Sequence, residues 1–209
     1  FGVPVVPAIL ITFIELAILG FIMGTIVVRT GLPSFIVTLG FWFASRGFAV
    51  FLSQTLVNQS RLSVKPYLKP PAGGGEDPTV IDNIFAFDKA FGLPFDAEVY
   101  YFVILVIITA FMLHRTRYGN WIYAAGGDAQ AARAVGVPVN RVKISLFMIS
   151  TCLACLLGVL TVMTSGASDP KAGDFRELHA IAAAVIGGCA LMGGYGSVIG
   201  AVLGALIFA

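Results

Sequence analysis

The chain has 209 residues, of which 58% are hydrophobic and only 11% are charged, and its formal net charge is +2. Soluble domains carry about 25% charged residues, so this composition excludes an ordinary water-soluble domain. The small positive charge also does not favour nucleic acid as a partner. The chain begins without a methionine or the basic segment of a signal peptide and ends inside an apolar run. We therefore expect a single transmembrane domain over 1–209, truncated at both ends.

Apolar runs predict an all-α polytopic membrane protein, because about 20 apolar residues in a helix cross a bilayer. The run at 99–113 is the shortest, and Tyr100 and Tyr101 at its start suit an interfacial aromatic belt. The four predicted spans are 8–28, 32–52, 99–113 and 144–166.

A fifth apolar segment, 180–209, has no charged residue and contains seven glycines. Its stretch Ile181–Gly194 has 14 residues, which rise only about 21 Å as a helix, whereas the hydrocarbon core is about 30 Å thick. The segment therefore predicts either a broken or re-entrant element beside the transport path or one long, kinked helix. Three glycines spaced four residues apart also predict a face for close helix packing, namely Gly196, Gly200 and Gly204.

Charge in the loops predicts the orientation of the spans. Residues 115–143 carry five Lys or Arg side chains against one Asp, whereas 54–98 carry four against six acidic side chains. Lys and Arg accumulate in cytoplasmic loops. We therefore expect 115–143 to be cytoplasmic and 54–98 to be periplasmic.

The predicted cytoplasmic loop contains the sequence "GGDAQAARAVGVP", which is typical of a short helix with both ends marked. Asp128 suits the N-cap position, Gly136 suits the left-handed position after the last turn, and Pro138 follows where a helix cannot continue. The side of this helix is mostly alanine, which another surface can approach closely. The helix is either a connector between two spans or a docking element for a cytoplasmic partner.

Three stretches carry a resemblance to a known family: "GNWIYAAGGDAQAARAVGVPVNRVK", "LPSFIVTLGFWFASRGFAV" and "ELHAIAAAVIGGCALMGGYGSVIGAVLGAL". In chain order, at 32–50, 119–143 and 177–206, they resemble the permease subunits of bacterial ABC importers of the ribose/xylose type. The superfamily also includes branched-chain amino-acid permeases. The chain departs from the family pattern at His179, where an acidic residue is common, and at Cys189, where a hydroxyl residue is common.

The resemblance implies a homodimeric channel in the bacterial inner membrane, two separate ATPase subunits and a periplasmic sugar-binding protein. ATP would bind to the partner ATPase, and no cofactor is expected in this chain. The resemblance also implies that 126–136 docks on the ATPase as the coupling element. The contacts with the ATPase are expected at Gly126, Gly127, Asp128, Ala131, Ala132, Arg133 and Gly136.

Ionisable groups within or beside apolar segments are candidates for the transport path, because a charge at mid-membrane usually faces protein or water. For Arg46 the alternative is a side chain that reaches the outer headgroups. The candidate residues for the path or a gate are Glu15, Arg46, Glu177, His179, Gly187, Gly188, Gly193 and Gly194.

No catalytic chemistry is expected in the chain. It has no G-x-x-x-x-G-K-[ST] motif for ATP, His114 and His179 lack the neighbours that a metal site needs, and Cys152 and Cys155 are expected to be packing residues in a helix. A self-sufficient secondary transporter is the alternative function, but its repeated broken helices and ion-coupling carboxylates are scarce here, with Glu15 alone. A membrane anchor would not need the glycine-rich end.

The predicted orientation can be tested by labelling. In a variant that lacks the three native cysteines, a cysteine introduced at Gly74 should react with an impermeant maleimide added outside intact cells. A cysteine introduced at Gln130 should react only after the cells are opened. Labelling of both positions from outside would contradict the orientation.

Overall fold

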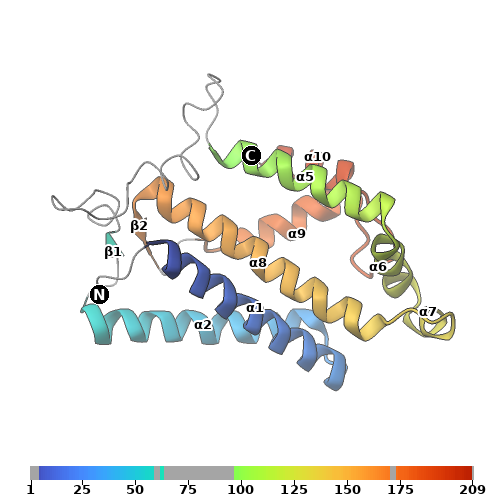
Figure 1. The fold of residues 1–209 in the computed structure, drawn as a ribbon, viewed down its shortest axis with the longest axis horizontal. Helices are drawn as coiled ribbons and strands as arrows, with labels where there is room; N and C mark the ends of the chain where they lie inside the picture. The colour runs from blue at the N-terminus through green and yellow to red at the C-terminus, as the bar shows by residue number, and fades with distance from the viewer. Residues whose placement is uncertain (1–4, 59–61, 64–96, 170–172, 209) are drawn as a thin grey trace. The chain divides into compact units, whose positions relative to one another are not determined.

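The computed structural model describes residues 5–58, 62–63, 97–169 and 173–208, and Figure 1 shows their elements in chain order. These are α1 (Val5–Thr30), α2 (Ser34–Val57), β1 (Leu62–Ser63), α5 (Ala97–Arg115), α6 (Arg117–Gly127), α7 (Ala129–Ala134), α8 (Val139–Ser165), β2 (Ala167–Ser168), α9 (Arg176–Ile186) and α10 (Val198–Phe208). Two compact units can be distinguished, one of Phe1–Glu98 with Ile144–Ala172 and the other of Val99–Lys143 with Gly173–Ala209.

The predicted spans are confirmed as helices. Helices long and apolar enough to cross a membrane cover Pro7–Thr30, Ser34–Leu56, Glu98–Arg115 and Val139–Ser165, so the chain is an all-α, multi-pass membrane protein. The helix α8 begins five residues before the predicted start at 144. The predicted loop at 54–98 also starts too early, because 54–57 still belong to α2, and most of this loop lies outside the described residues.

Hydroxyl side chains within the spans bond to their own helix. Thr12 donates to the carbonyl of Ala8 over 2.9 Å, and Thr25 donates to that of Phe21 over 2.7 Å. The same four-residue step recurs at Thr55 in α2. Lipid offers no hydrogen-bond partner, so this local bond allows a polar side chain to lie in an apolar helix.

In the first unit, α1 and α2 form a hairpin, and α1 packs closely on α8. The turn of the hairpin uses Gly31 at φ +69°. A Cβ atom at Gly20 would lie 2.9 Å from the Cα atom of Met148, and one at Gly24 would lie 2.9 Å from that of Ile144. These two glycines therefore let the backbones of α1 and α8 approach each other. The strands β1 and β2 pair antiparallel in this unit.

In the second unit, α6 folds back sharply from the end of α5. Thr116 caps α6 by accepting a hydrogen bond from the backbone N–H of Gly119. A Cβ atom at Gly119 would lie 2.7 Å from the Cα atom of Leu113, so only glycine fits this close approach. The helix α6 is not among the elements predicted from the sequence.

The glycine-rich segment is broken, which favours the first of the two predicted alternatives over one kinked helix. The helix α9 ends at Ile186, and α10 begins only at Val198. A Cβ atom at Gly200 would collide with the carbonyl of Gly187, and one at Gly204 would collide with that of Ala183. The later residue, Gly204, contacts the earlier one, Ala183, whereas Gly200 contacts Gly187. The helices α9 and α10 are therefore antiparallel. The eleven residues of α9 rise only about 17 Å.

We predict that the contact between α1 and α8 is sensitive to one added methyl group. In Gly20→Ala the new Cβ would meet the Thr151 hydroxyl and the backbone of Met148, and overpacking of this kind costs about 1–3 kcal/mol. In Gly158→Ala, on α8, a Cβ meets nothing within 4 Å, so better helix propensity should leave stability unchanged or slightly higher. The apparent melting temperature in detergent should fall for the first variant alone. A melting temperature of Gly20→Ala equal to that of the unmodified protein would contradict the close contact between α1 and α8.

Candidate functional site

The predicted cytoplasmic loop contains α6, the short helix α7 and the first residues of α8. Asp128 lies at the junction of α6 and α7, and its carboxylate accepts hydrogen bonds from the N–H groups of Gln130 at 2.8 Å and Ala131 at 3.0 Å. Its own N–H donates to the carbonyl of Ala124 over 3.2 Å. The same residue therefore ends α6 and begins α7, which leaves no free linker between the two helices.

The N-cap bonds also act on the acidity of Asp128. Hydrogen bonds from Ala131 and then Gln130 lower the pKa of its carboxyl below the ordinary value, since they stabilise the charged form. The cap is therefore fully formed above the ordinary Asp pKa of about 3.9, and its contribution disappears only as the pH falls through the lower, folded-state pKa. Near neutral pH the cap is intact.

The C-terminal end of α7 is capped as the sequence predicts. Gly136 has a φ of +87°, and its N–H donates to the carbonyl of Arg133 over 3.0 Å. The N–H of Val137 donates to the carbonyl of Ala132 over the same distance. This pair of bonds is the Schellman arrangement, and it satisfies carbonyls that a short helix would otherwise leave free.

The alanine face of α7 differs from the expectation at one position. Ala132 is only 4% exposed, and Val139 and Val142 at the start of α8 are each 1% exposed. Ala132 therefore packs inside its own chain and cannot itself contact a partner. On α7, Ala131 and Ala134 are exposed, and Val135, the C-cap residue directly after the helix, is 80% exposed.

The remaining predicted coupling residues have different surroundings. Arg133 is exposed, and its guanidinium donates to the side-chain carbonyl of Asn140 over 3.1 Å. Gly126 and Gly127 are the last residues of α6. They face the turn before α10, where a Cβ atom at Gly126 would lie 2.6 Å from the backbone nitrogen of Gly194.

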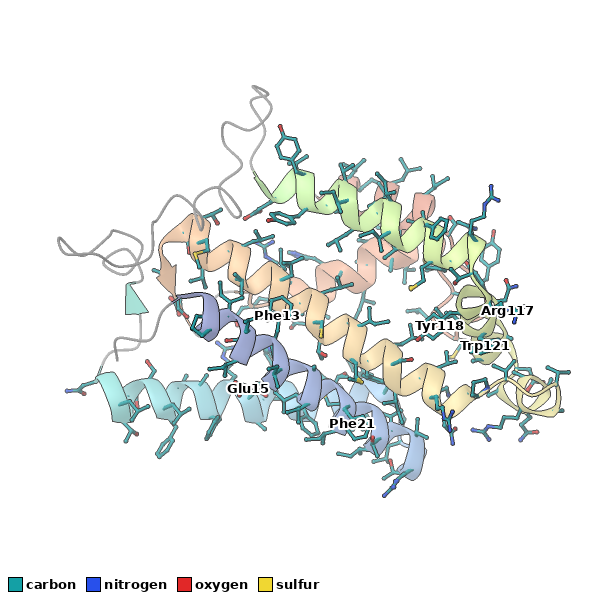
Figure 2. The ribbon with its side chains drawn as sticks, in the orientation of Figure 1. Phe13, Glu15, Phe21, Arg117, Tyr118 and Trp121 are labelled. Carbon is teal, nitrogen blue, oxygen red and sulfur yellow. The ribbon has the colours of Figure 1, made fainter. Side chains whose placement is uncertain are left out.

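The predicted path residues are distributed over both units. In the first unit, Glu15 is exposed on α1, where Figure 2 labels it, and the guanidinium of Arg46 on α2 lies 5.5 Å from the ring centre of Trp42. In the second unit, Glu177 lies half-buried in the first turn of α9, and His179 is exposed two residues further on along the same helix. Neither unit alone groups the four side chains into one cluster.

The glycines of the segment between α9 and α10 divide into two kinds. Gly188, Gly193 and Gly194 have φ values of +82°, +89° and +80°, a region that other residues rarely adopt. Gly187 and Gly196 provide space instead, since a Cβ atom at Gly196 would lie 3.0 Å from the sulfur of Cys189. Of the predicted packing face, Gly200 and Gly204 lie on α10 against α9, whereas Gly196 precedes α10 and lies against Cys189.

The cysteines lie in apolar surroundings. Cys155 is 4% exposed, and Cys152 lines an apolar groove of about 270 Å³ between α1 and α8, with Phe13 on the opposite side. The groove is otherwise lined by Met148, Ile149, Leu153 and Leu156. Within the described part of the chain, no three His, Cys, Asp or Glu side chains are close enough to hold a metal ion.

The structure also shows what sequence reasoning missed, namely α6. Arg117 and Trp121 are exposed on this helix and Tyr118 is half-buried; Figure 2 labels all three. Tyr123 points in another direction, and its hydroxyl donates to the backbone carbonyl of Gly196 over 2.9 Å. The threonine cap at Thr116 is the signal that would have located this helix.

We predict that the cap at Asp128 controls the local stability of α7. In Asp128→Ala the N–H groups of Gln130 and Ala131 lose their acceptor, so amide hydrogen exchange in 129–136 should be faster than in the unmodified protein at neutral pH. Gln130→Ala, which keeps the carboxylate, is the matched control and should exchange slowly. Unchanged exchange in Asp128→Ala would show that packing alone holds the helix.

Comparison with known proteins places the chain in a family. Residues 1–209 match the family described as "Branched-chain amino acid transport system / permease component". The chain is 34% identical over 196 residues to the fructose import permease protein FrcC of Rhizobium meliloti, covering 91% of this chain and 50% of that protein. It is 34% identical over 191 residues to the ribose import permease protein RbsC of Escherichia coli K12, covering 91% of this chain and 55% of that protein.

A third relative is the xylose transport system permease protein XylH of Escherichia coli K12, which is 42% identical over 130 residues, or 62% of this chain and 33% of that protein. The chain thus spans about half the length of the first relatives that it matches. No solved structure matches it. The match along its full length shows that the chain belongs to the family of branched-chain amino acid transport system permease components.

Proposed function

We propose that this chain is part of the membrane-spanning subunit of an ATP-driven importer in the bacterial inner membrane. The subunit carries a monosaccharide that a periplasmic binding protein delivers, and a second copy completes the channel. A separate ATPase subunit binds and hydrolyses ATP. The observation that carries this proposal is the short helix α7, which is capped at both ends and exposes an apolar side on a loop predicted to face the cytoplasm.

The exposed side of α7 fits a protein partner. Ala131, Ala134 and Val135 follow the spacing i, i+3 and i+4, so they lie on one side of the helix. Lipid does not cover a loop in the cytoplasm, and small side chains allow another backbone to approach closely. An apolar groove on the ATPase would bury Val135, and fully burying one such side chain contributes about 1.5–3 kcal/mol.

Mechanical coupling follows from the rigidity of this element. Six residues of helix are marginal alone in water, but the cap at Asp128 and the bonds at Gly136 close both ends of α7. Burial of Ala132 fixes the helix to the rest of its unit. A partner that moves can therefore move α7 as a body, and its different contacts in two states can shift the equilibrium of the permease.

The sugar class rests on the relatives, whose names specify fructose, ribose and xylose. A branched-chain amino acid is the competing substrate class, because the matched family is named for it. We propose that Glu15, Arg46, Glu177 and His179 contribute to the path or its gates, since these ionisable groups lie in or next to apolar segments.

The proposal predicts that Val135→Glu abolishes transport without removing the permease from the membrane. The intact permease would be reconstituted in proteoliposomes with its ATPase and binding protein, and uptake of labelled fructose, ribose, xylose and leucine would be measured with ATP. The original protein should import at least one of the sugars. Val135→Glu should weaken binding of the ATPase at least tenfold, because it replaces about 1.5–3 kcal/mol of apolar burial with a charge.

Asn120→Glu is the matched control, because it places the same charge at an exposed position of the same loop, on α6. It should bind the ATPase and import sugar normally. Import of leucine but of none of the three sugars would contradict the proposed sugar and identify an amino acid as the substrate. Normal ATPase binding by Val135→Glu would show that α7 is only a connector.

A further inference from the structure

We infer that Tyr123, together with a backbone contact between Gly126 and the turn at Gly193 and Gly194, transmits the movement of α7 to the glycine-broken segment. Tyr123 is then a positioning residue for transport, and the turn between α9 and α10 is the element that the ATPase moves. This inference rests on the proposed function and names the residues inside the permease that carry the coupling.

The first step is the junction between α7 and α6. Asp128 ends one helix and begins the other, with an N–H bond to Ala124 behind it and carboxylate bonds to Gln130 and Ala131 ahead of it. Since a single residue serves both caps, a displacement of α7 moves the end of α6 rather than stretching a loop.

The second step is the contact of α6 with the turn. A Cβ atom at Gly126 would lie 2.6 Å from the nitrogen of Gly194, one at Gly193 would lie 2.9 Å from the carbonyl oxygen of Gly126, and one at Gly194 would lie 2.7 Å from the Cα atom of Gly127. Real Cβ atoms essentially never come closer than 3.0 Å to other heavy atoms. The two backbones therefore lie in direct contact, with no side chain between them.

The third step is the hydrogen bond of Tyr123, which lies one helical turn before Gly126 and Gly127 on the same side of α6. Its hydroxyl donates to the carbonyl of Gly196 over 2.9 Å, across 73 positions of the chain. This bond holds the turn at Gly196, and the glycine contact holds it at Gly193 and Gly194. Two separated attachments transmit rotation as well as translation.

The fourth step is the rigidity of the turn itself. Ala190 donates to the carbonyl of Tyr195 over 2.9 Å, and Gly193 donates to that of Ala190 over the same distance. Ser197 accepts from the N–H of Gly200 at the start of α10. Beyond the turn, Gly200 packs on Gly187, so α9 and α10 move with it. The opposite side of the turn is exposed, with Met192 at 95%.

The test separates transport from ATP hydrolysis. In the reconstituted complex, Tyr123→Phe keeps the ring and removes only the hydroxyl. We expect ATPase activity still stimulated by the binding protein, but about fivefold less sugar imported per ATP, which is the effect of about 1 kcal/mol from one lost hydrogen bond. Gly126→Ala should lower this ratio further. Tyr195→Phe is the matched control, since its side chain is 77% exposed in the same turn, and it should keep the original ratio.

Each outcome of this assay either supports or overturns the inference about Tyr123. A normal ratio in Tyr123→Phe overturns the inference, and so does a parallel fall of hydrolysis and transport, because a merely structural role lowers both together. If the unmodified complex neither imports sugar nor responds to the binding protein, the proposed function fails instead, and the Tyr123 inference falls with it. Faster amide exchange at 190–197 in Tyr123→Phe, with α7 unchanged, would support the attachment independently of transport.

Discussion

Close contact between backbones is the interaction on which this structure depends. In lipid, apolar side chains gain nothing by leaving their surroundings for another helix, so helices associate through tight packing and a few hydrogen bonds. Glycine permits the closest packing because it has no side chain. The chain uses it between α1 and α8 at Gly20 and Gly24, between α9 and α10 at Gly200 and Gly204, and between α6 and the turn at Gly126.

The water-facing loop follows a different rule. There, short helices are held by hydrogen bonds at their ends and by burial of a few small side chains, as Asp128, Gly136 and Ala132 show. The two rules meet at the end of α6, where the capped junction of the loop adjoins the glycine contact with the broken segment. The capped junction and the glycine contact thus join the loop to the apolar broken segment through a shared helix cap and a direct backbone contact.

Local patterns in the sequence predicted much of this architecture. The four spans follow from long apolar runs, and the caps of α7 follow from Asp128 and Gly136, because these features depend on near neighbours. The packing glycines at 200 and 204 were also readable, since their spacing is that of one helical turn, whereas Gly196 precedes α10. In each case the information lies within a few residues of the feature.

Features that depend on distant partners could not be predicted in this way. Burial of Ala132 depends on the packing of the folded loop, and an alanine looks the same in a sequence whether it faces outward or inward. The helix α6 was hidden by Gly119, Gly126 and Gly127, which have low helix propensity and are used here for tertiary contacts. The bond of Tyr123 spans 73 positions, and no local pattern indicates it.

The shared cap at Asp128 has a consequence for how permeases of this kind can be recombined. Under the proposed function, a segment that docks on one ATPase could not be exchanged for another by grafting α7 alone, because Asp128, which accepts the first hydrogen bonds of α7, also ends α6. The glycine contact extends the unit further, to the turn at 187–197. The smallest exchangeable part is therefore discontinuous in the chain, and a functional chimera would have to inherit both stretches from the same parent.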